Sequence, residues 1–211
     1  MSAVESISPY LAVSSVINFD HPSIQILAAE LRADQTSTTA IAQACFEWVR
    51  DQIRHSSDYQ LNPVTCRASE VLEHRTGYCY AKSHLLVALL RACSIPAGFC
   101  YQRLSFDEAS ERYCLHGLVA VKLPGLGWYR LDPRGNKADI DAQFCPPQEQ
   151  LAYSAQQLGE ADWPVIFAEP LPIVVQTLQA SLDWESVLAA IPDIALADFA
   201  VMTQGLESVS C

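Results

Sequence analysis

The chain has 211 residues, with 13 Lys and Arg against 24 Asp and Glu, so its formal net charge is −11. Half of the residues are apolar and 18% are charged, a composition typical of a packed globular chain and not of a disordered, collagen-like or coiled-coil one. Nucleic-acid binders concentrate Lys and Arg, so the acidic balance argues against nucleic acid as a partner. The same charge favours neutral or basic substrate segments over acidic ones.

The sequence shows no targeting or membrane segment. Its first 20 residues contain no Lys or Arg, and the most apolar run, residues 85–90, is far shorter than the roughly 20 residues that cross a bilayer. We therefore expect a cytoplasmic protein without membrane contact. In that compartment the eight cysteines are expected to be reduced thiols. The length predicts one domain over residues 1–211.

The first half of the chain is predicted to be mainly helical, after a short strand within residues 1–20. A helix is predicted at 22–32, and a longer one follows the N-cap candidates at 36–39, because its apolar residues recur every three or four positions. The polar residues 55–66 are predicted to form a loop. A short helix is expected at 68–74, a break at 75–77 and a largely apolar helix at 79–93.

The second half is predicted to contain the sheet. Strands are expected at 98–104, 115–123 and 128–131, and the turn at 124–127 joins the last two as a hairpin. Residues 146–211 are interpreted as a C-terminal cover, irregular up to Gly159, with a strand at 163–167 and helices at 170–180 and 183–190. Helices followed by antiparallel strands predict an α+β fold.

Cys79 is the candidate nucleophile. It follows Gly77 at the first turn of an apolar helix, where unpaired N–H groups and the helix dipole favour a thiolate and can stabilise an oxyanion. Such a cysteine needs a base and a group that orients the base. His116 and Asp132 lie at similar distances before and after the 124–127 turn, so an antiparallel hairpin brings their side chains together.

An ordered run of five segments resembles the transglutaminase-like superfamily over about residues 36–137. The segments are EWVRDQI, the turn GYC, LLRACSIPA, the strand that contains His116, and WYRLDP. The resemblance implies a papain-like α+β core in which N-terminal helices, including the nucleophile helix, pack on an antiparallel sheet. It also implies Cys79 as nucleophile, His116 as base and Asp132 as orienting acid, in thioester chemistry on amides with no metal or other cofactor.

The chain departs from the family pattern in two places. Residues 80–84 lack the acidic and aromatic pair that many members carry after the cysteine, and spacing does not fix the upstream oxyanion donor. The candidates for oxyanion or substrate binding are Tyr59, Gln60, Asn62 and Tyr78.

Each candidate also has a second interpretation. Cys79 and His116 are alternatively core residues, and Asp132, before Pro133, alternatively initiates a turn. A zinc site at Cys79, Cys114 and His116 would need a fourth ligand. Arg130, Arg134 and Asn136 either bind a substrate carboxylate or carbonyl, or fix the strand exit by surface hydrogen bonds.

We therefore expect a thiol-dependent hydrolase that cleaves an amide or peptide bond through a Cys-His-Asp triad and a thioester intermediate. Its substrates would be peptides, proteins or small amides. The alternatives are an acyltransferase that uses an amine acceptor or a carrier-bound thioester, and a catalytically idle member that binds a peptide.

Overall fold

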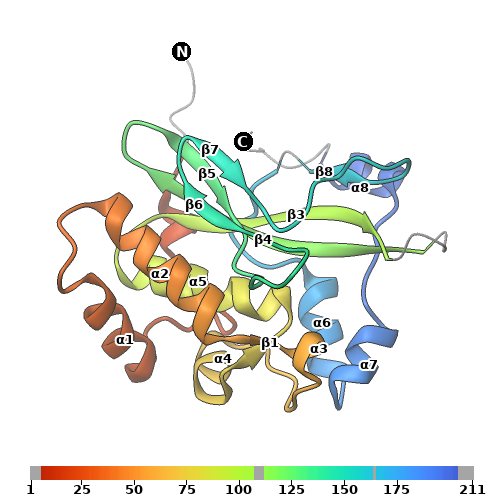
Figure 1. Ribbon diagram of the computed structural model, residues 1–211, viewed down its shortest axis with the longest axis horizontal. Coiled ribbons are helices and arrows are strands. Elements are labelled where there is room, and N and C mark those ends of the chain that lie inside the picture. The colour runs from red at the N-terminus through yellow and green to blue at the C-terminus, as the bar shows by residue number, and fades with distance from the viewer. Residues whose placement is uncertain (1–5, 107–111, 164, 204–211) are drawn as a thin grey trace.

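The computed structural model describes residues 6–106, 112–163 and 165–203, with the side chains of residues 200–203 excepted. Helices of the N-terminal half lie on one side of a central antiparallel sheet, and Figure 1 shows α1, α2, α4 and α5 together there. The structure is therefore the mixed α+β fold that the sequence predicts.

In chain order the helices are the 3-10 helix η1 (Ser8–Leu11), α1 (Pro22–Arg32), α2 (Thr38–Gln52), α3 (Ser56–Tyr59), α4 (Ala68–His74), α5 (Cys79–Ala92), α6 (Pro172–Ala180), α7 (Trp184–Ala189) and α8 (Leu196–Thr203). The strands are β1 (Arg54–His55), β2 (Thr76–Gly77), β3 (Ala97–Ser105), β4 (Tyr113–Leu123), β5 (Gly127–Leu131), β6 (Gln143–Cys145), β7 (Gln148–Gln150) and β8 (Ala161–Asp162). Among the described residues, no helix combines the length and apolarity needed to cross a bilayer.

The four-stranded sheet has the order β5-β4-β3-β8, and every neighbouring pair is antiparallel. The predicted hairpin between β4 and β5 is confirmed: Leu123 pairs with Gly127. Gly125 and Gly127 adopt φ values of +75° and +88°, which residues with a Cβ rarely adopt. The turn therefore fixes the register that carries His116 and Asp132.

Helix α5 is the centre of the core. Residues 85–90 have no exposed surface on any face of this helix, which packs against α1, α2 and α4 and against β3 and β4. Burial all round explains why the apolar residues of α5 form no single stripe. Because α5 is held on all sides, its first residue, Cys79, has a fixed position relative to the sheet.

Three predicted segments of the N-terminal half differ from the structure. Residues 8–11 form a 3-10 helix, and no strand is present in the described part of residues 1–20. The predicted loop at 55–66 contains His55 of β1 and the helix α3, while the predicted break at 75–77 contains β2, which pairs in parallel with β1. The pairing of two-residue strands that are 22 positions apart depends on tertiary contacts and leaves no periodic pattern in the sequence.

The C-terminal cover also differs in detail. The β6–β7 hairpin at 143–150 extends into the segment, from residue 146, that is expected to be irregular. The strand expected at 163–167 is shorter and lies earlier, at 161–162, and Phe167 forms only an isolated bridge with Phe99. Residue 164 lies outside the described residues.

Candidate active site

Cys79 is the first residue of α5 and is 6% exposed. The preceding Tyr78 is extended, so the chain enters the helix at the cysteine. A Cβ at Gly77 would lie 3.0 Å from the Cβ of Ala81, a contact tighter than most, so glycine favours this close entry into the helix. The first N–H groups of an α-helix have no intrahelical acceptor, and they therefore surround the Cys79 side chain with positive dipoles.

His116 on β4 and Asp132 after β5 are in direct contact. The distance from His116 Nε2 to Asp132 Oδ2 is 2.7 Å, and both side chains are buried. Backbone N–H groups of Arg134 and Ala152 also donate to the Asp132 carboxylate, each at 3.1 Å. Three donors therefore orient this carboxylate toward the imidazole.

The pair is held in its charged form. Burial by itself disfavours the imidazolium, but the Asp132 carboxylate and the Cys79 side chain outweigh burial and raise the pKa of His116 to about 10. Burial likewise opposes ionisation of Asp132, yet His116 and the two backbone donors lower the pKa of its carboxyl. Because Asp132 occupies Nε2, Nδ1 is the ring nitrogen of His116 that is left for the Cys79 side chain in the same cleft.

A cleft of about 560 Å³ contains Cys79 and His116. One group of lining residues is charged and includes Asp58, Arg134 and Lys137. Leu188 and Ile191, from α7 and the segment that follows it, contribute apolar surface. This segment is anchored to the sheet, since the Leu115 N–H donates to the Pro192 carbonyl at 2.7 Å.

Aromatic rings support the two residues of the cleft. The Tyr153 ring meets the His116 ring edge-on, with centroids 5.0 Å apart. Tyr80, which follows the cysteine, is buried and donates its hydroxyl to the Leu115 carbonyl on β4. The imidazole and the start of α5 are therefore both tied to the same strand.

Of the four predicted oxyanion candidates, only Tyr78 lines the cleft. Its hydroxyl already donates to the Trp184 carbonyl at 2.5 Å. Tyr59 is 59% exposed, Gln60 follows it at the end of α3, and the Asn62 side chain accepts from the Trp184 N–H at 2.9 Å. The helical turn of α3, which the sequence did not predict, directs this segment away from the cleft.

His55 is a cleft residue that sequence reasoning missed. It lies on β1 beside Gly77 of β2 and is buried. Its Nδ1 has no hydrogen-bond partner in the described structure, and the Asp58 carboxylate lies 3.8 Å from it. Burial, with the nearby Arg134 cation, lowers the pKa of His55 well below its ordinary value, so the ring is neutral at pH 7. Its place depends on the β1–β2 pairing, for which the sequence offers no signal.

Arg130, Arg134 and Asn136 have different surroundings. Arg130 forms ion pairs with Glu149 and Asp162, and Asn136 exchanges hydrogen bonds with residues 141 and 142, as expected of groups that fix the strand exit. Arg134 is only 7% exposed and pairs with Asp58 inside the cleft, so it is not a surface residue.

No set of metal ligands assembles in the described part of the chain. Across residues 6–106, 112–163 and 165–203, no three His, Cys, Asp or Glu side chains are grouped so that they could hold an ion. Cys114 lines the cleft as a free thiol, and burial raises its pKa to about 12. The cysteines from Cys45 to Cys145 are free thiols, and Cys211 lies outside the described residues.

Comparison with solved structures identifies similar folds. A protein from Cytophaga hutchinsonii, provisionally described as a cysteine protease, is 22% identical with a TM-score of 0.50, and the match covers 63% of this chain and 43% of that one. The periplasmic domain of TgpA from Pseudomonas aeruginosa is 21% identical with a TM-score of 0.47, covering 62% of this chain and 48% of that one. The chain thus matches less than half the length of either structure, and at such identities the likeness concerns the fold alone.

No curated protein matches the chain. The family model of the transglutaminase-like superfamily matches residues 25–133, which is more than half of the chain and includes the start of α5, His116 and Asp132. This protein therefore belongs to the transglutaminase-like superfamily.

Proposed function

We propose that this protein is a thiol-dependent hydrolase that cleaves an amide or peptide bond, with Cys79 as nucleophile, His116 as general acid and base, and Asp132 as the orienting carboxylate. One observation carries the proposal: Cys79 begins a buried helix and shares a cleft with His116, whose Nε2 lies 2.7 Å from Asp132. This is the relation of nucleophile, base and orienting group that acyl transfer requires.

In the proposed reaction the Cys79 thiolate attacks the carbonyl carbon of the substrate. The C–N bond then breaks as the His116 imidazolium gives its Nδ1 proton to the leaving amine, which departs and leaves a thioester. Water attacks the thioester, His116 takes a proton from it, and the acid is released as the thiolate returns. Asp132 keeps Nε2 bonded throughout and stabilises the imidazolium.

Two groups are suited to stabilise the oxyanion of the tetrahedral intermediate. The backbone N–H of Cys79 stands at the start of α5, where helix N–H groups lack intrahelical acceptors. We assign the second donor to the imidazole of His55, which lines the same cleft and is neutral at pH 7. Its Nδ1 makes no hydrogen bond, and the Asp58 carboxylate lies 3.8 Å from it. Tyr78 is less suited because its hydroxyl is bonded to Trp184.

The first test measures alkylation by iodoacetamide against pH, with each modified cysteine identified by mass spectrometry. Cys145 is the internal reference, because its thiol is exposed on β6. We expect Cys79 to react faster than Cys145 below pH 7, and to lose this advantage in His116→Ala. Equal and slow reaction of Cys79 in both proteins would refute the enzyme proposal and leave peptide binding as the function.

The second test identifies the reaction. Fluorogenic peptide amides with neutral, basic and acidic side chains are incubated with the wild type and with Cys79→Ala, with and without a fluorescent primary amine. Free acid as the product in both conditions supports hydrolysis. Incorporation of the amine in preference to water would replace the hydrolase proposal by acyl transfer.

A further inference from the structure

An ion pair of low exposure joins the two walls of the cleft. Asp58 belongs to α3 in the helical half, and Arg134 follows β5 of the sheet. The guanidinium donates to both carboxylate oxygens, at 2.6 and 3.0 Å, and Arg134 is only 7% exposed. Lys137 adds a third contact to Asp58 at 3.1 Å. A bidentate pair of this kind fixes distance and orientation together.

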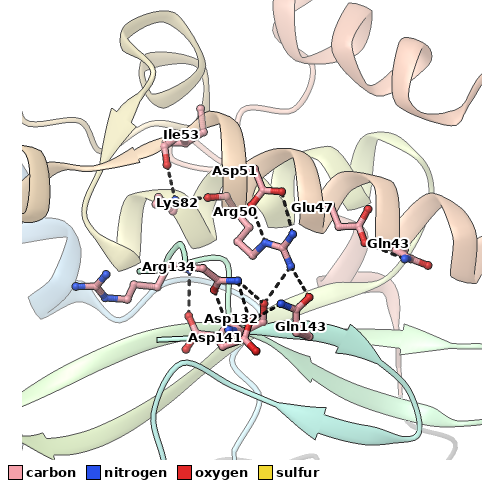
Figure 2. Close-up of polar contacts among 12 residues, drawn as sticks. Gln43, Glu47, Arg50, Asp51, Ile53, Lys82, Asp132, Arg134, Asp141 and Gln143 are labelled. Atoms are coloured by element: carbon pink, nitrogen blue, oxygen red, sulfur yellow. Dashed lines mark hydrogen bonds and ion pairs between the residues drawn. The ribbon is translucent and has the colours of Figure 1, made fainter. Parts of the chain in front are cut away.

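Arg134 is also bonded to the proposed triad. Its backbone N–H donates to Asp132 Oδ1 at 3.1 Å (Figure 2). Its guanidinium lies 5.8 Å from the centre of the Tyr153 ring, which in turn contacts His116 edge-on. Arg134 therefore contacts Asp58 through its side chain and, through its backbone, the carboxylate that is bonded to His116.

The titratable and charged groups around the Cys79–His116 pair come from both halves of the chain. They are His55 on β1, Asp58 on α3, Tyr78, Tyr80 and Lys82 at α5, Tyr101 on β3, Cys114 on β4, Asp132, Arg134 and Lys137 after β5, Tyr153 and Glu160. Burial raises the pKa of Tyr78, Cys114 and Tyr153 to about 12, so these three are neutral between pH 5 and 9. The Arg134 cation lines the same cleft as Cys79 and acts on its side chain through space.

We propose that Asp58 and Arg134 are positioning residues for the reaction at Cys79: the ion pair holds Asp132 in line with His116, and the Arg134 charge favours the Cys79 thiolate. This inference rests on the proposed function. It assigns the two residues opposite electrostatic effects. Asp58 moderates the Arg134 cation, so loss of Asp58 favours the thiolate, whereas loss of Arg134 disfavours it.

The test is the pH at which Cys79 alkylation reaches half of its maximal rate. Asp58→Asn is expected to move this midpoint down by about 1 pH unit, and Arg134→Gln to move it up by about 1, for a unit charge acting through a partly buried site. The double variant is expected to return close to the wild-type midpoint. Lys82, whose pKa is lowered to about 7, responds to both substitutions and reduces the shifts without reversing them.

Arg134→Lys separates charge from position. Lysine keeps the charge but not the two parallel hydrogen bonds, so we expect a wild-type midpoint with about a tenfold lower turnover. Glu149→Gln is the matched control, because it removes a carboxylate from the Arg130 ion pair outside the cleft. Thermal unfolding of each variant establishes that it is folded. If Asp58→Asn does not fold, Asp58→Glu replaces it. For Asp58→Glu we expect an unchanged alkylation midpoint and a reduced turnover.

A merely structural ion pair would give a different pattern. Both single variants would then change in the same direction, and the double variant would be no better than either of them; that result overturns the inference. An unreactive Cys79 in the wild type would instead overturn the proposed function, so the two failures are distinguishable.

Discussion

Lys82, a buried lysine near the candidate nucleophile, allows a quantitative test of how burial changes the pKa of a charged group. It lies one turn after Cys79 on α5 and has no exposed surface. Its ammonium donates to the carbonyls of Arg50, at 3.1 Å, and Ile53 at the end of α2 (Figure 2). No carboxylate bonds to it directly in the described structure, although Asp132 acts on it through space. Burial and the Arg134 cation lower its pKa to about 7.

The lowered pKa has a defined sign and size in the free energy of unfolding. A fall from 10.5 to about 7 corresponds to about 5 kcal/mol of lost preference for the charged form. Below pH 7 both states are protonated and the folded protein bears this full cost. Between pH 7 and about 10.4 the folded protein releases the proton before the unfolded chain does, so stability rises with pH.

We therefore predict that the wild type gains about 3–4 kcal/mol over Lys82→Met between pH 7 and 10, since part of the total of about 5 kcal/mol falls outside this range. The measurement is urea unfolding of both proteins at intervals from pH 6 to 10. Lys122→Met, at a partly exposed lysine on β4, provides the reference curve. A stability difference between wild type and Lys82→Met that stays constant over this range would refute the reasoning, because it would mean that Lys82 does not change protonation in the folded state.

Three further predictions concern the cleft. The pKa of His116 is raised to about 10, so the wild type should be more stable than His116→Gln below about pH 6.5. Thermal unfolding should show that this advantage disappears as the pH rises through 10. An advantage that grows with pH would contradict the raised pKa of His116. A Cβ at Gly117 would lie 2.8 Å from Cδ1 of the buried Tyr80, so Gly117→Ala should cost about 1–3 kcal/mol in urea unfolding, and an unchanged midpoint would mean that the ring moves freely. His55→Phe should lower amide turnover by about 100-fold, while the rate of Cys79 alkylation, which forms no oxyanion, stays unchanged. His55→Gln should recover part of the lost turnover. Equal losses in both variants would argue against His55 as a hydrogen-bond donor to the oxyanion.

Much of the candidate site could be predicted because its residues lie in strong local patterns. Gly77 and Cys79 precede an apolar stretch long enough for a helix, and the structure begins α5 at Cys79. The turn at 124–127 lies midway between His116 and Asp132, and the hairpin brings these side chains within 2.7 Å. The spacing of apolar residues, the choice of turn residues and the distance of a residue from a turn are properties of short segments, so they can be read directly from the sequence.

The surroundings of the site could not be predicted in the same way. The loop before α4 was expected to supply an oxyanion donor, but α3 directs Tyr59 to solvent. His55 reaches the cleft through a two-residue parallel pairing with β2, and Arg134 is buried against a carboxylate 76 positions earlier. Both contacts join residues far apart in the sequence, so no pattern within a short segment predicts either of them.

The sequence by itself determined the fold class, the start of α5 and the hairpin that joins His116 to Asp132, because the local spacing of apolar residues and the turn residues are sufficient for these features. The tertiary structure alone decided which polar residues share the cleft, and with them the charge state of the site. The reason is physical: burial and charges from distant segments shift a pKa, and both depend on how the helical half packs against the sheet.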